Sequence, residues 1–127
     1  MSYVFTKTLD VPFDQAIEKT TAALAERGFG VLTTIDVKAT LKKKIDVDFR
    51  PYTILGACNP GYAHMALQAE QHIGAMLPCN VVVQEVDGGV EVAAVDPVAS
   101  MASVANASLG DVATQVRAML QEVVESL

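Results

Sequence analysis

The residues best suited to chemistry in this sequence are two cysteines, each placed where one predicted element meets the next. Cys58 ends a predicted strand, and the Asn59-Pro60 pair after it is typical of a helix start. Backbone N–H groups at a helix start favour an anion, and a thiolate is one such anion. Gly56 would let a ligand or another chain approach the backbone closely. The alternative interpretation is that Cys58 is a small, buried apolar residue.

The second thiol, Cys79, begins another predicted strand and is followed by Asn80, which can cap or bridge a loop. The distance between the thiols depends on topology. Parallel strands joined by a crossover would place Cys58 and Cys79 at opposite ends of the sheet, whereas antiparallel strands would bring them to the same end. A disulfide would require Cα atoms within about 7 Å of each other. The sequence leaves both arrangements open.

Further candidates lie on the helix predicted after Cys58. His64 is a candidate base for that thiol, and the candidate metal ligands are Cys58, His64 and Cys79, although Cys58 with His64 has no familiar zinc spacing. The alternative is that His64 and His72 are surface histidines on a polar stripe. Glu70 falls on the side of the helix that carries its apolar residues, including Leu67. We interpret it either as a buried, partnered carboxylate or as the edge of an apolar stripe.

Composition excludes several classes of protein. Charged residues make up 19% of the 127 residues and hydrophobic residues 51%, which excludes intrinsic disorder. The formal net charge of −6 is unfavourable for phosphate binding, so we expect no nucleic-acid partner, and we interpret the Lys42–Lys44 run as a solvated helix end. The sequence contains no G-x-G-x-x-G, no P-loop and no G-x-S-x-G motif.

The compartment and the domain count follow from length and patterning. We expect a single domain over residues 1–127, because domains of this size are common. The N-terminus lacks a basic region followed by an apolar one, and no apolar run approaches the roughly 18 residues of a membrane span. We therefore expect a cytoplasmic protein with two reduced thiols and no membrane partner.

Hydrophobic periodicity predicts the elements that must position the thiols. Strands are expected at about 3–9, 29–35, 52–58, 79–86 and 90–95, and helices from 13 to Gly28, after Asp36 to 45, at 61–72 and at 108–127, with a loop or short helix at 98–107. Asp87-Gly88-Gly89 is a tight turn, so the last two strands must form an antiparallel hairpin. This order indicates an α+β or mixed α/β fold, with a sheet of about five strands covered by helices and a long amphipathic C-terminal helix.

Several ordered segments together resemble the family called domain of unknown function 302. They are GFGVLTTIDVK at 28–38, FRPY at 49–52, ILGACNP at 54–60 and LPCNVVV at 77–83, within a motif-bearing part of about 12–97. The resemblance implies an α+β domain with a mostly antiparallel sheet, a TATA-binding-protein-like topology and a homodimer, but no established activity and no DNA binding. The family's hallmark positions correspond to Gly56, Cys58, Asn59, Pro60, Pro78, Cys79 and Asn80. Because this motif holds both thiols, it favours a role for them beyond packing.

Three functions follow from these patterns. The first is a small-ligand or metal/thiol-binding module that acts as a homodimer. Its candidate residues are Gly56, Cys58, Asn59, Glu70, Cys79 and Asn80. The second is a cysteine-dependent enzyme or redox protein that uses Cys58. The third is a structural or interaction dimer, for which the stripe of the C-terminal helix and the Val-rich hairpin offer apolar surface. The sequence identifies no cofactor and no reaction.

Overall fold

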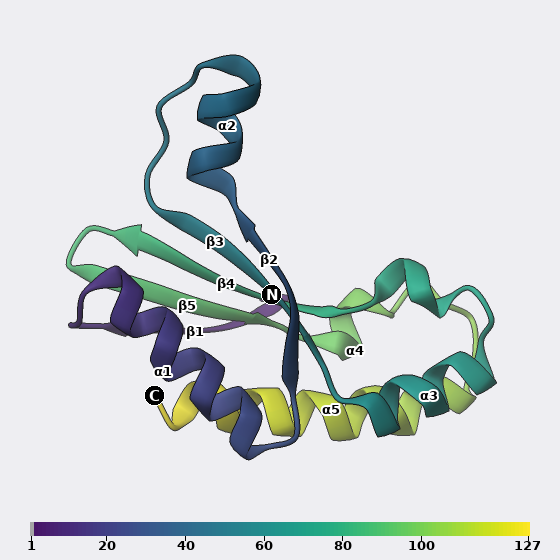
Figure 1. Cartoon of the computed structure of the whole chain (residues 1–127). Coiled ribbons are helices and arrows are strands. Elements are labelled where there is room, and N and C mark those ends of the chain that lie inside the picture. Colours follow the sequence, from purple (N-terminus) through teal and green to yellow (C-terminus); the bar gives the residue numbers. More distant parts are fainter. Residues whose placement is uncertain (1) are drawn as a thin grey trace.

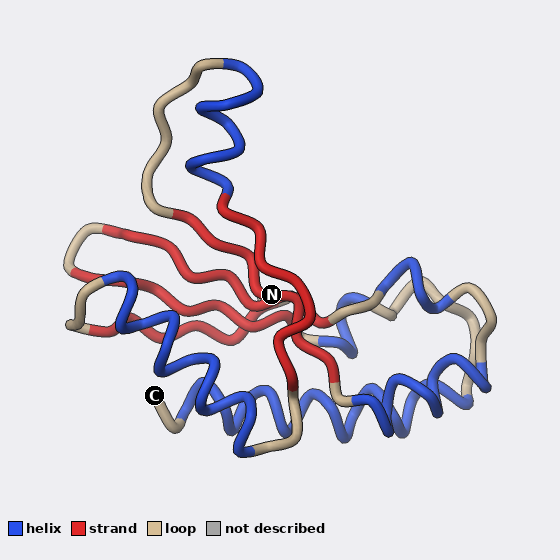
Figure 2. Tube along the Cα trace, viewed as in Figure 1, coloured by secondary structure: helices blue, strands red, loops and turns tan. Residues whose placement is uncertain are grey.

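Strands and helices alternate along the chain in the order that hydrophobic periodicity predicts (Figures 1 and 2). The computed structural model describes residues 2–127. The strands are β1 (Val4–Leu9), β2 (Gly30–Asp36), β3 (Tyr52–Cys58), β4 (Cys79–Val86) and β5 (Gly89–Val95). The helices are α1 (Phe13–Glu26), α2 (Val37–Ile45), α3 (Pro60–Ala69), α4 (Pro97–Ser100) and α5 (Ser108–Glu125), with a 3₁₀ turn, η1, at Ile73–Met76. Within residues 2–127, no helix combines the length and the apolar character needed to cross a membrane.

The five strands form one sheet in the order β1-β5-β4-β3-β2, and every neighbouring pair is antiparallel. The fold class is therefore α+β, as predicted, while a topology like that of the TATA-binding protein stays a prediction. The pairing of β2 with β3 shifts register between Val31 and Thr33. This irregularity leaves Leu32 out of the ladder, and 68% of its surface is exposed.

The hydrophobic core lies between one face of the sheet and the helices α1 and α5 (Figure 1). The apolar stripe of α5 is buried there, and its buried residues are Leu109, Val112, Ala113, Val116, Leu120, Val123 and Val124. The sequence suggested that this stripe offers surface for self-association. That expectation is wrong, because the stripe is consumed by packing within the chain.

Local signals position the helix ends as predicted. Gly28 adopts a φ of 81° after α1, its N–H donates to the carbonyl of Ala25, and the Phe29 N–H donates to the carbonyl of Leu24. This pair of bonds is the Schellman arrangement, which satisfies the last carbonyls of a helix. At the opposite kind of helix end, the side chain of Asp36 accepts a hydrogen bond from the Ala39 N–H and caps the N-terminus of α2.

The helix after Cys58 differs from its prediction. It ends at Ala69 rather than near residue 72, and Glu70 follows it in an extended conformation. Leu67 is 45% exposed, so it does not belong to the buried side of the helix, which is represented by Ala66. The prediction was wrong for Leu67 alone, because the other members of the predicted side, Ala63, Ala66 and Glu70, are buried or half-buried.

Candidate ligand-binding site

The two thiols lie at the same end of the sheet, which is the antiparallel alternative. In the ladder between β3 and β4, Ala57 is the register partner of Cys79, so Cys58 is one residue beyond that pair. Successive side chains of a strand point to opposite faces. Cys58 and Cys79 therefore leave their strands in different directions, which disfavours a disulfide, and both thiols are free.

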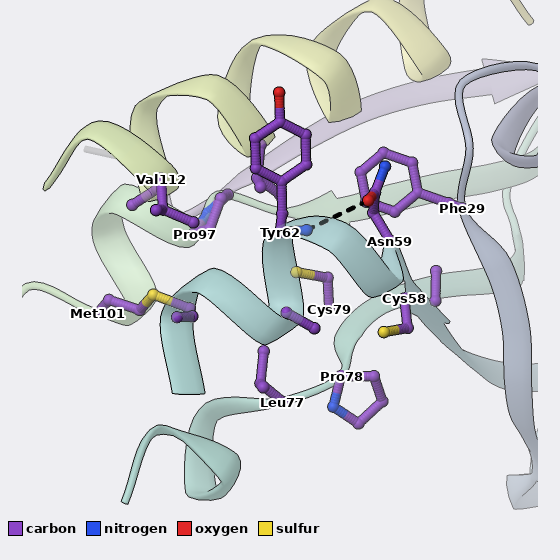
Figure 3. Close-up of a pocket in the computed structure, with 15 residues that line it drawn as sticks. Phe29, Cys58, Asn59, Tyr62, Leu77, Pro78, Cys79, Pro97, Met101 and Val112 are labelled. Atoms are coloured by element: carbon purple, nitrogen blue, oxygen red, sulfur yellow. Dashed lines mark hydrogen bonds between the residues drawn. The ribbon is translucent and has the colours of Figure 1, made fainter. Parts of the chain in front are cut away.

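A small apolar cavity adjoins both thiols (Figure 3). Its volume is about 30 Å³, close to the share of liquid volume that one water molecule takes. It is bounded by the ends of β3 and β4, by α3 and α5, and by the segments around Phe29, Leu77 and Met101. The lining residues are Phe29, Ala57, Cys58, Asn59, Tyr62, Ala63, Ala66, Leu77, Pro78, Cys79, Pro97, Met101, Val112, Ala113 and Val116.

Asn59 is held at the rim of this cavity by the start of α3. Its Oδ1 accepts a hydrogen bond from the Tyr62 N–H at 3.3 Å, so the side chain caps the helix as its sequence position predicts. Its Nδ2 lies 3.0 Å from where a Cβ on Gly28 would be. The end of α1 and the start of α3 therefore meet at Asn59, next to Cys58.

Tyr62 stands between the cavity and the surface. Its ring lines the cavity (Figure 3). Its hydroxyl donates to Oε1 of Gln115 at 2.9 Å in an exposed hydrogen bond. Asn59, Tyr62 and Gln115 also line an open surface depression of about 260 Å³. Asn59 and Tyr62 therefore lie between the cavity and this depression.

The two thiols differ in their electrostatics. Burial and, to a smaller extent, the neighbouring Cys58 together raise the pKa of Cys79 from its ordinary 9.0 to about 11. Cys79 is therefore a protonated, apolar group at neutral pH. Cys58 is only half-buried. Any reagent that reaches the cavity from the surface meets Cys58 as the more accessible thiol.

Other predicted site residues lie away from the cavity. His64 is exposed on α3 and does not line it. Glu70 Oε2 accepts from the His72 N–H at 3.3 Å, which ties it to the turn after α3. Asn80 is exposed on β4 opposite Gly56. Across residues 2–127, no three His, Cys, Asp or Glu side chains gather closely enough to hold a metal ion.

Gly56 serves packing rather than ligand access. A Cβ at this position would collide with Oγ1 of Thr33 and would lie 2.8 Å from Cγ of Pro78. We expect Gly56→Ala to lower the free energy of unfolding by about 1–3 kcal/mol, the usual cost of overpacking. Urea denaturation would measure this, with Gly74→Ala as the matched control, because a Cβ on Gly74 meets nothing within 4 Å. Equal effects of the two substitutions would contradict this packing role.

Sequence reasoning missed most of the apolar lining, including Phe29, Tyr62, Leu77, Met101 and Val112. These residues come from five separate segments, and no local spacing connects them. A usable signal was present at Tyr62, a large aromatic residue on the first turn of the helix that Asn59 caps.

The profile of the family described as "Domain of unknown function DUF302" matches residues 5–127. The chain belongs to this family. The DUF302 match extends beyond the segments that suggested it and includes the C-terminal helix α5. No curated protein matches the sequence. Among solved structures, the chain is similar to one titled as the crystal structure of an uncharacterized conserved DUF302 protein from Bacillus stearothermophilus. The two chains are 26% identical with a TM-score of 0.91, and the alignment covers 98% of each.

Proposed function

We propose that this DUF302 domain binds a small, largely apolar ligand in the cavity beside Cys58. The observation that carries the proposal is the meeting of two free thiols, one capping asparagine and an apolar lining at a single cavity. Apolar cavities with few convergent polar groups are typical of small-molecule sites. No metal is part of the proposal, because no three His, Cys, Asp or Glu side chains among residues 2–127 gather closely enough to hold one.

The size of the cavity defines the class of ligand. A volume of about 30 Å³ is far below the roughly 300 Å³ of an ordinary ligand pocket. A linear apolar chain or a compact apolar group would fit after Tyr62 turns outward and joins the cavity to the neighbouring depression. The polar end of such a ligand would then lie near Asn59 and Gln115.

A titration with n-pentanol tests this proposal, because this probe has a short apolar chain and one hydroxyl. We expect saturable changes in the amide NMR signals of Cys58, Asn59 and Tyr62. Ala63→Leu fills the cavity from α3 and should abolish these changes, since Ala63 lines it. Ala118→Leu adds the same volume at an exposed position of α5 and should retain them. Signals that do not saturate, or saturation that survives Ala63→Leu, would disprove the site.

A second candidate function is a thiol enzyme or redox protein that uses Cys58, as a nucleophilic cysteine should be partly exposed. The half-burial of Cys58 at the start of α3 favours it. The candidate base His64 is exposed and does not line the cavity that adjoins Cys58, which weighs against that role. Alkylation of Cys58 by iodoacetamide at neutral pH discriminates the two functions. An alkylation rate of Cys58 no faster than that in the unfolded chain would contradict the thiol enzyme and would be consistent with the ligand-binding function.

A further inference from the structure

A second group of polar side chains, apart from the thiols, lies where the end of β5 meets α5. Asp96 follows β5 and is 8% exposed, and its Oδ2 accepts a hydrogen bond from Nε of Arg117 at 3.0 Å. Its Oδ1 accepts from the Val98 N–H at 2.9 Å and caps α4. The Asp96 N–H donates to the carbonyl of Tyr3 at 2.8 Å, so its backbone is fixed as well. Asp96 therefore holds Arg117 from a well-defined position.

The guanidinium of Arg117 is held on two sides and keeps donors for a ligand. Its central carbon lies 5.3 Å from the centroid of the Phe5 ring, which is a cation–π contact. The side chain is 43% exposed. The bond to Asp96 uses one of the five N–H donors of the group, and no other hydrogen bond of this guanidinium involves residues 2–127. The fork of the two terminal nitrogens matches the geometry of a carboxylate.

An open depression of about 400 Å³ adjoins this ion pair. Small-molecule sites commonly have volumes of roughly 300–1,000 Å³, so the depression is large enough for a small ligand. Besides the ion pair, its lining consists of the hydroxyls of Ser2 and Thr114 and the aliphatic side chains of Val98, Ala99 and Ala102. It shares no lining residue with the cavity beside the thiols, so the two sites are distinct.

The two hydroxyls of this depression can accept a hydrogen bond from a ligand but cannot donate one. Oγ1 of Thr114 donates its hydrogen to the carbonyl of Gly110, and Oγ of Ser2 donates to the carbonyl of Val4, both at 2.8 Å. A hydroxyl has a single hydrogen, so only oxygen lone pairs are left. Thr114 and Arg117 are three residues apart on α5 and are therefore neighbours on one face of the helix. A ligand that uses both needs an anionic group and, close to it, a hydrogen-bond donor.

We propose that this depression binds a free α-amino acid with a small aliphatic side chain. The carboxylate of the amino acid pairs with the terminal nitrogens of Arg117. Its ammonium donates to Oγ1 of Thr114 and faces the negative charge of Asp96, while its side chain lies against the aliphatic lining. A zwitterion suits this place better than an anion such as phosphate. The reason is that the ion pair has no net charge and the whole chain carries a formal −6.

A titration with L-valine tests the site. We expect saturable changes in the amide NMR signals of Val98, Ala99 and Thr114. Isovalerate keeps the carboxylate and the branched chain but lacks the ammonium, and isobutylamine lacks the carboxylate. Each should bind about tenfold or more weakly than L-valine, since each loses a charged hydrogen bond. Changes that do not saturate with L-valine overturn the proposal, and isovalerate that binds as tightly as L-valine overturns the amino-acid class.

Thr114→Glu tests the role of Arg117 without leaving Asp96 buried and unpaired, as a change of Arg117 itself would. Thr114 is exposed, and a glutamate there reaches the terminal nitrogens of Arg117 from one helical turn away. The dissociation constant for L-valine should rise about tenfold or more. Ala118→Glu adds the same charge at an exposed position of α5 outside the depression and should retain binding.

Binding of L-valine that survives Thr114→Glu would overturn the proposal. Ala63→Leu, which fills the thiol cavity, should leave this binding unchanged, because Ala63 does not line the depression. The two sites can therefore fail independently: loss of the n-pentanol response leaves the amino-acid site intact, and loss of the L-valine response leaves the thiol cavity intact.

Discussion

Leu120→Ala should lower the free energy of unfolding by about 2–5 kcal/mol, the range observed for truncating a fully buried leucine. Leu120 is 0% exposed at the centre of the α5 stripe, which packs on the sheet. The loss combines the transfer free energy of the removed methyl groups with the cavity that the rigid sheet cannot close. Since domains are stable by only about 5–15 kcal/mol, this single change would remove a large part of the total.

Urea denaturation would measure this loss, and Leu67→Ala is the matched control. Leu67 is also on a helix but is 45% exposed, so its truncation should change stability by no more than about 0.5 kcal/mol. A loss at Leu120 below about 1 kcal/mol, the scale of a surface substitution, would contradict the burial of α5 within one chain.

The pKa of Cys79 predicts a loss of stability in alkaline solution. A pKa raised from 9.0 to about 11 means that folding favours the protonated thiol. This contribution is complete below pH 9.0, decreases by about 1.4 kcal/mol per pH unit up to about pH 11, and is absent above that. The total change attributable to Cys79 is therefore roughly 2–3 kcal/mol.

The stability of Cys79→Ala relative to the wild type isolates this effect, because the other titrating groups cancel in the difference. The variant lacks the thiol and cannot lose this contribution. Its free energy of unfolding, compared with that of the wild type, should therefore rise by roughly 2–3 kcal/mol between pH 9.0 and about pH 11. A difference that stays constant from pH 9.0 to about pH 11 would show that Cys79 titrates normally in the folded state.

Features that depend on a few neighbouring residues could be predicted from the sequence. The end of α1 at Gly28, the cap of α2 at Asp36 and the cap of α3 at Asn59 are confirmed. Each depends on a residue type whose backbone or side chain satisfies groups within the next turn. The β4–β5 hairpin is confirmed for the same reason, since Asp87-Gly88-Gly89 permits only a tight reversal.

Features that depend on distant segments could not be predicted from the sequence. Whether Cys58 and Cys79 share an end of the sheet depends on the direction of β3 relative to β4, which a long connection leaves open. The burial of the α5 stripe depends on how much sheet surface is available to it. The family resemblance supplied the antiparallel sheet where periodicity alone could not. Apart from Tyr62, the apolar lining of the cavity had no signal in either.

The register shift in β2 determines how further copies of this chain can add to it. β2 forms one edge of the sheet, and a regular edge strand exposes unpaired N–H and C=O groups that recruit strands from other molecules. The irregularity between Val31 and Thr33 bends this edge and interrupts the spacing that an incoming strand would have to match. We therefore expect this edge of the sheet to be a poor template for a further strand.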